Sequence, residues 1–154
     1  MSGGTALPTV DFSEAKARLS DLMTAVVHDH QPRLVQRHRG KEAMLLVSSE
    51  DLARSLSSFR FDSRVTLDQG EVTVELERFG LLGFGESFES AMGDLVTELR
   101  AYARRFFERW AFYRETDRAE HWPWLLRFAL TPADRQLALL VEDSRATADD
   151  DRAA

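Results

Sequence analysis

The fold of the first part of the chain is decided by residues 9–52, TVDFSEAKARLSDLMTAVVHDHQPRLVQRHRGKEAMLLVSSEDL. A short extended stretch, TVDF, comes first. Ser13 then stands where a helix N-cap belongs, because its hydroxyl can accept a free backbone N–H of the first turn. Apolar residues recur at helical spacing after it, and Pro32 prevents the helix from continuing further. The residues of this apolar face are Ala15, Leu19, Leu22, Met23, Val26 and Val27.

A β-hairpin is predicted next. Residues 33–37, RLVQR, and 42–48, EAMLLVS, form its strands, and Gly40 supplies the positive φ of the connection. Ser48 or Ser49 then caps a second, shorter helix whose first turn is acidic, as the helix dipole favours. The predicted order is strand, helix, strand, strand, helix.

The second half of the sequence begins with another predicted hairpin. Residues 59–67 and 71–79 alternate apolar and polar side chains around the turn sequence DQGE. Residues 81–85, bracketed by glycines, predict a third short strand. Glu86 or Ser87 is then expected to open a helix.

Two helices and a tail complete the prediction. Over residues 88–113 the apolar positions follow spacings of three, four or seven, which predicts one long amphipathic helix. Pro123 breaks this pattern, and Thr131 followed by Pro132 signals the start of a last helix. Residues 142–154, EDSRATADDDRAA, are acidic and rich in small side chains, so we expect a disordered tail.

These elements predict an α+β fold with an N-terminal unit over residues 1–58, a second α+β domain over 59–141 and the tail over 142–154. A hydrophobic content of 44% and a charged content of 30% are typical of soluble globular proteins. The absence of cysteine excludes disulfides and thiolate metal sites. No apolar run approaches the roughly 18 residues of a membrane span, and we expect a cytoplasmic location.

Positive charge is concentrated in the first hairpin although the net charge of the chain is −6. Residues 1–58 hold seven basic and seven acidic side chains, whereas residues 59–154 hold thirteen and nineteen. Residues 33–41 hold four basic side chains and no acidic one before Glu42; the basic residues are Arg33, Arg37, Arg39 and Lys41. Such a cluster is typical of a nucleic-acid-binding surface, and a solvated hairpin without a partner has the same pattern.

Residues 9–56 resemble the N-terminal domain of Phd/YefM-type antitoxins. The resemblance is carried by the SEA of the helix start with the following Leu19, Pro32 before the central strand, Arg37 and Gly40 of the turn, and LVS with the acidic pair after it. It implies a small α/β unit whose sheet pairs with that of a second copy, in a homodimer or a higher even oligomer. It also implies binding of operator DNA, and neutralisation of a cognate toxin by the part of the chain that follows.

The same resemblance assigns a DNA face. In the family, the basic residue after SEA and the basic residues of the hairpin are associated with DNA, which here are Lys16, Arg37 and Arg39. Lys16 stands where arginine is more often seen, so a point charge suited to phosphate replaces a bidentate base contact. With the basic cluster, the expected DNA-binding residues are Lys16, Arg33, Arg37, Arg39 and Lys41.

In the second half, GESFESAMGDLVTEL after a hairpin and a short strand resembles HicB-type antitoxins. HicB-type domains are similar to ribonuclease H folds, which makes strand carboxylates candidate metal ligands. These carboxylates are Asp62, Asp68, Glu71, Glu75 and Glu77. The glutamates alternate on one strand face opposite Arg60 and Arg64, which favours a solvated, ion-paired surface, and we expect no metal, cofactor or catalysis.

The best candidates for a toxin-binding surface are the aromatic residues of RRFFERWAFYRE and HWPWLLRF, because aromatic and arginine side chains give large contact area at low entropic cost. They are Phe106, Phe107, Trp110, Tyr113, Trp122 and Trp124. A stripe at helical spacing is equally typical of an internal core.

The sequence thus predicts a non-enzymatic antitoxin that binds its toxin and represses its own operon; the alternative is a dimeric interaction module or transcriptional regulator without a toxin.

Overall fold

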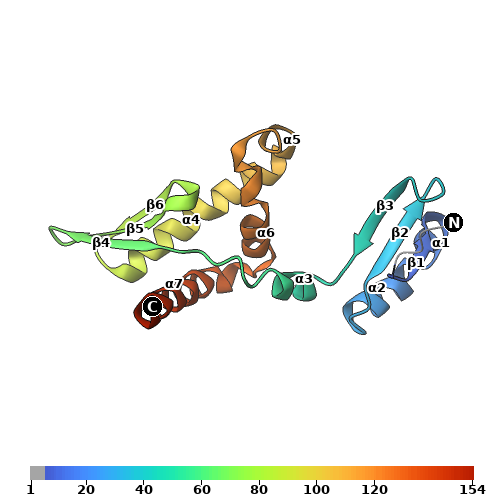
Figure 1. Cartoon of the computed structure of the whole chain (residues 1–154), viewed down its shortest axis with the longest axis horizontal. Helices are drawn as coiled ribbons and strands as arrows, with labels where there is room; N and C mark the ends of the chain where they lie inside the picture. The colour runs from blue at the N-terminus through green and yellow to red at the C-terminus, as the bar shows by residue number, and fades with distance from the viewer. Residues whose placement is uncertain (1–5) are drawn as a thin grey trace. The chain divides into compact units, whose positions relative to one another are not determined.

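The computed structural model describes residues 6–154 and divides into two compact units, the first ending at Ser55 and the second spanning Leu56–Ala154 (Figure 1). The sequence had placed this division after position 58. Both units combine helices with a three-stranded sheet, so the fold is α+β. None of the helices in residues 6–154 combines the length and the apolar character that a membrane span requires.

The first unit is a three-stranded sheet with two helices on one face and a third helix after it. The central strand β2 pairs in parallel with β1 and antiparallel with β3, which leaves β3 at an edge. The strands are β1 (Thr9–Asp11), β2 (Arg33–Arg37) and β3 (Glu42–Leu46). The helices are α1 (Phe12–Ala17), α2 (Leu19–Val27) and α3 (Ser49–Ser55).

Local capping explains where these helices begin and end. The first helix begins at Phe12, one residue before the expected cap, because the carboxylate of Asp11 accepts the backbone N–H of Ser13 at 3.2 Å. A non-helical Arg18, with φ −124° and ψ 32°, divides the expected single helix into α1 and α2. The predicted cap of α3 is confirmed at Ser48, whose hydroxyl accepts the N–H of Asp51 at 3.0 Å.

The second unit is an antiparallel sheet in the order β4-β5-β6, with α4 packed on one face (Figure 1). Its strands are β4 (Arg64–Asp68), β5 (Glu71–Leu76) and β6 (Leu81–Gly85). The last strand and the capping of α4 (Phe88–Glu108) by Ser87 are confirmed as predicted. The expected strand from residue 59 begins only at Arg64, because the preceding segment contacts helices instead of a strand.

Gly83 allows the sheet and α4 to approach closely. A Cβ atom at this position would lie 2.3 Å from the carbonyl oxygen of Ala91 and 2.6 Å from the backbone nitrogen of Leu95. Since both neighbours are helix backbone, neither can rotate away. Glycine in the middle of β6 therefore meets a packing requirement, because no side chain fits between the strand and α4.

Three further helices complete the second unit. They are α5 (Trp110–Tyr113), α6 (Trp122–Leu130) and α7 (Gln136–Ala153), joined by short 3₁₀ segments at Asp117–His121 and Ala133–Arg135. Another 3₁₀ segment, Glu77–Phe79, connects β5 to β6. The expected single helix ends earlier than predicted, because Arg109 adopts φ −113° and ψ 31°. Pro123 lies in the first turn of α6, where its missing N–H costs no helical hydrogen bond.

The expectation of a disordered tail from residue 142 was wrong, because α7 continues to Ala153. Asp143 is buried, forms two hydrogen bonds of 2.6 and 3.1 Å with Arg127, and accepts the backbone N–H of Phe61 at 2.9 Å. Thr147 donates to the carboxylate of Asp62 at 2.7 Å. Asp143 and Thr147 of this segment therefore bind partners far away in the sequence, which its composition does not indicate.

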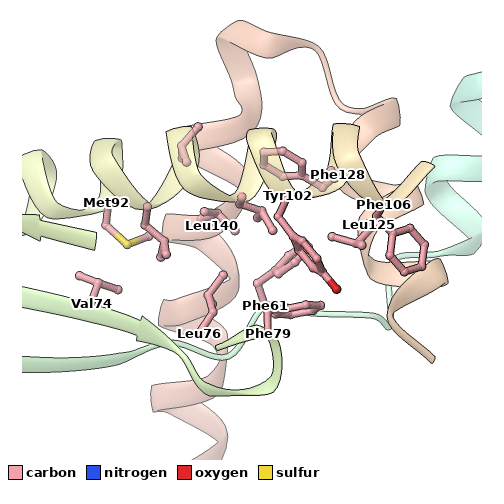
Figure 2. Packing of buried hydrophobic residues seen from close by; sticks show 14 of the residues in the cluster. Phe61, Val74, Leu76, Phe79, Met92, Tyr102, Phe106, Leu125, Phe128 and Leu140 are labelled. Carbon is pink, nitrogen blue, oxygen red and sulfur yellow. The ribbon is translucent and has the colours of Figure 1, made fainter. Parts of the chain in front are cut away.

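The main core lies in the second unit, between α4, the sheet and α6 with α7 (Figure 2). Phe61, Leu95 and Phe106 have no exposed side-chain surface. The residues labelled in Figure 2 are Phe61, Val74, Leu76, Phe79, Met92, Tyr102, Phe106, Leu125, Phe128 and Leu140. The core of the first unit is much smaller, with Ala15, Leu22 and Val35 at its centre.

Candidate functional site

Two of the predicted DNA-binding cations lie against one aromatic ring in the first unit. The ammonium of Lys16 is 5.0 Å, and the guanidinium carbon of Arg37 is 5.5 Å, from the centroid of Phe12. Phe12 is half-buried and packs against the small core, so it joins the two cations to the folded unit. Attraction between a cation and a ring face favours this arrangement.

The hairpin connection carries two more predicted cations. Arg39 and Lys41 are exposed, and Arg39 has a left-handed φ of 57° between His38 at 52° and Gly40 at 82°. The sequence had assigned a positive φ to the glycine alone. Arg37 at the end of β2 forms an ion pair with Glu42 across the hairpin, so an acidic side chain competes with any anion for its guanidinium.

Arg33 is separated from this group, contrary to what its place in the basic cluster suggests. It lies at the other end of β2, roughly 13 Å from Arg37 along an extended strand. Its guanidinium donates to the side-chain oxygen of Gln31 at 2.7 Å and to the carbonyl of Pro32 at 3.2 Å. The structure thus brings together Lys16, Arg37, Arg39 and Lys41 at one end of the sheet and leaves Arg33 at the other.

An open apolar face lies beside the cations. Met44 is paired with the buried Val35, so it points to the helix side of the sheet, yet 51% of it is exposed because α1 and α2 do not cover β3. Leu19 and Met23 of α2 are 60% and 66% exposed. Two adjoining shallow pockets lie on this face, and Leu19 and Leu46 line both of them. We call Leu19, Met23, Val27, Met44 and Leu46 the open face.

The helical spacing of the apolar residues was predicted correctly, but only half of these residues are buried by the unit itself. Ala15, Leu22 and Val26 are buried, whereas Leu19, Met23 and Val27 are exposed. The signal was present in the sequence: an apolar face this wide needs more cover than a sheet of three short strands provides.

The aromatic residues predicted to bind a toxin divide into a core group and a surface group. Phe106 and Tyr113 are buried and stack with centroids 5.1 Å apart. Phe107, Trp110 and Trp124 are half-buried, and Trp122 is 37% exposed. Phe112, which the prediction left out, is 55% exposed. In the two aromatic stretches, the exposed aromatic side chains are therefore Phe112 and Trp122.

Two titratable groups are buried in this aromatic region. The hydroxyl of Tyr102 lies 2.8 Å from Nδ1 of His121, whose ring packs on Phe79 with centroids 4.7 Å apart. Burial lowers the pKa of His121 and raises the pKa of Tyr102. The hydrogen bond between the two side chains satisfies two polar groups of the core.

Two of the candidate metal-binding carboxylates form ion pairs with one arginine. Glu75 and Glu77 lie 3.9 and 3.0 Å from the guanidinium of Arg64. Within residues 6–154 no three histidine or acidic side chains are grouped closely enough to hold a metal ion.

Comparison with known proteins places the chain among antitoxins. Residues 6–143 match the PHD_like family, described as "Antitoxin of toxin-antitoxin, RelE / RelB, TA system", and the chain belongs to this family. A crystal structure from Syntrophomonas wolfei subsp. wolfei, an antitoxin part of an inferred toxin/antitoxin system, has a similar fold with a TM-score of 0.75 and 21% identity. The similarity covers 86% of this chain and 96% of that one. No curated protein matches the sequence.

Proposed function

We propose that the protein is an antitoxin that binds its cognate toxin through the second unit and represses its own operon through the first. The observation that carries this proposal is the open face of the first unit beside four clustered cations. A family of antitoxins implies a toxin partner, and the two surfaces of the first unit fit dimerisation and DNA binding.

A second copy of the first unit is the natural cover for the open face. Burying one exposed Leu or Met side chain contributes about 1.5–3 kcal/mol, so mutual burial of Leu19, Met23 and Met44 supplies a substantial driving force. Because a two-fold interface uses the same patch on both copies, each buried side chain counts twice. The small core of the isolated unit makes this contribution important for its stability.

Dimerisation also doubles the cation group. Lys16, Arg37, Arg39 and Lys41 from two copies give eight basic side chains for the phosphates of a two-fold symmetric operator. Each phosphate contact adds about −0.9 to the slope of log K against log salt, so binding should weaken steeply with salt. Release of Arg37 from Glu42 is part of the binding step.

The second unit is acidic, with nineteen acidic against thirteen basic side chains over residues 59–154. This charge favours association with a basic toxin. Trp122 and Phe112 are exposed beside the half-buried Trp110, which provides the aromatic anchors that protein interfaces use most. We assign the toxin-binding surface to this region.

The test is co-expression of the tagged protein with its neighbouring reading frame, followed by a gel shift on the upstream DNA. Co-purification of a small partner and a salt-sensitive shift support the proposal. Arg39→Ala with Lys41→Ala should reduce affinity and flatten the salt slope, whereas Arg54→Ala, an exposed cation paired with Glu50 on α3, should not. Absence of both a partner and a shift would indicate an interaction module without a toxin.

A further inference from the structure

Strand β4 has an open edge and uncovered apolar side chains. It lies at one edge of the sheet, whose strand order is β4-β5-β6 (Figure 1). All five of its residues are exposed. Val65 and Leu67 are paired with Val74 and Val72, so they share the side of the sheet that carries the core. They nevertheless remain 49% and 71% exposed, because α4 does not extend over this strand.

The backbone of the same two residues is directed to the open edge. The hairpin turn consists of Gln69 and Gly70, with positive φ values of 49° and 85°, so the flanking pair of Asp68 and Glu71 exchanges hydrogen bonds. Hydrogen-bonded residues alternate along an antiparallel strand. The N–H and C=O groups of Val65 and Leu67 therefore point away from β5, and in the described chain no strand pairs with them.

We propose that β4 pairs with β4 of a second copy, antiparallel and centred on Thr66. In this register Val65 lies opposite Leu67 of the second copy, and Arg64 lies opposite Asp68. The sequence RVTLD is complementary to itself when one strand is reversed: apolar residues meet apolar residues and the positive end meets the negative end. The pairing extends the three-stranded sheet to six strands.

Self-pairing fits this edge better than the opposite one. The other edge strand, β6, reads LLGFG, which has no charged residue and two glycines that weaken a strand. Natural edge strands are usually protected by proline, lysine or a bulge. The central three residues of β4 include none of these protective features. The strand has a positive charge at one end and a negative charge at the other, which favours antiparallel pairing with a strand of the same sequence.

This interface is separate from the one proposed for the first unit. A chain with two different two-fold interfaces forms tetramers or longer assemblies unless both interfaces join the same two copies. Assembly through β4 therefore sets how many copies of the first unit are presented together.

Cysteine cross-linking of the full chain tests the register directly, since the protein has no cysteine of its own. Across the new interface Thr66 faces Thr66 of the second copy as a non-hydrogen-bonded pair, whose Cα atoms lie about 4.5 Å apart, a distance that a disulfide can span. Thr66→Cys should form a covalent dimer under mild oxidation. Thr73→Cys is the matched control, because it faces the same side but lies three strand spacings, roughly 14 Å, from its copy.

A charge exchange provides a second test. Asp68→Arg in the Thr66→Cys background places arginine opposite arginine and should slow cross-linking at least several-fold, and adding Arg64→Asp should restore it. Cross-linking of Thr66→Cys but not of Thr73→Cys, with this rescue, supports the proposal. Absence of the Thr66→Cys dimer, or equal cross-linking of both cysteine variants, overturns it.

Discussion

Replacing Asp143 with alanine is expected to destabilise the second unit strongly. The substitution leaves the guanidinium of Arg127 buried without its carboxylate and leaves the backbone N–H of Phe61 without an acceptor. Removing one partner of a buried ion pair costs about 3–5 kcal/mol. With an m-value of about 1.5 kcal/mol per molar urea, the unfolding midpoint should fall by roughly 2–3 M.

Tryptophan fluorescence is a suitable assay because all three tryptophans lie in the second unit, at positions 110, 122 and 124. Glu115→Ala, which breaks an exposed ion pair with Arg114, is the matched control and should change stability by less than about 1 kcal/mol. The double variant Arg127→Met with Asp143→Leu should regain much of the loss, since no buried charge remains. A midpoint shift below about 0.5 M for Asp143→Ala would refute the reasoning, because it would mean that water already screens the pair.

Three further predictions use the same unfolding assay or sedimentation. Gly83→Ala should lower the free energy of unfolding by about 1–3 kcal/mol, because the added carbon overlaps the backbone of α4. Gly93→Ala, with open space around the added carbon, should stabilise α4 by about 0.5–1 kcal/mol. Urea midpoints in the opposite order would contradict this prediction. Burial lowers the pKa of His121 from 6.5, so near that pH only the unfolded chain binds a proton at this residue. The contribution of His121 to folding stability is therefore complete above pH 6.5 and declines as the pH falls. The free energy of unfolding should depend less steeply on pH between 7.5 and 5.5 in His121→Asn, and an unchanged dependence would rule this contribution out. Leu19→Glu on the open face, made in an Asp68→Arg background that weakens the proposed β4 pairing, should halve the assembly mass in sedimentation equilibrium. The exposed Ser20→Glu in the same background should leave the mass unchanged, and equal masses would contradict the dimer interface proposed for the open face.

The elements that the sequence predicts well are those that short-range chemistry determines. Ser48 and Ser87 cap helices, and residues 81–85 form a strand, because capping and strand signals act within a few residues. The breaks at Arg18 and Arg109 were missed, since neither residue is a glycine or a proline and the apolar period continues across both.

The candidate site could be predicted only in part, because long-range contacts determine which of its residues come together and which are exposed. Arg33 shares the basic cluster in sequence but lies at the far end of β2, because a strand separates residues that a local count places together. Phe106 and Trp122 carry the same aromatic signal, yet one is buried and the other exposed. Periodicity identifies an apolar face, and only the packed structure shows whether the chain itself covers it.

The hydrogen bond between Phe61 and Asp143 spans 82 residues, so it affects the order in which the two units fold during synthesis. The first unit is compact by itself, so it can begin to fold once it leaves the ribosome. The segment at Phe61 must wait for Asp143, a delay of several seconds or more at roughly 5–20 residues per second. During that interval a nascent chain can present a folded cationic hairpin while the acidic unit is still incomplete, so the surface proposed to bind DNA is expected to mature before the surface proposed to bind a toxin.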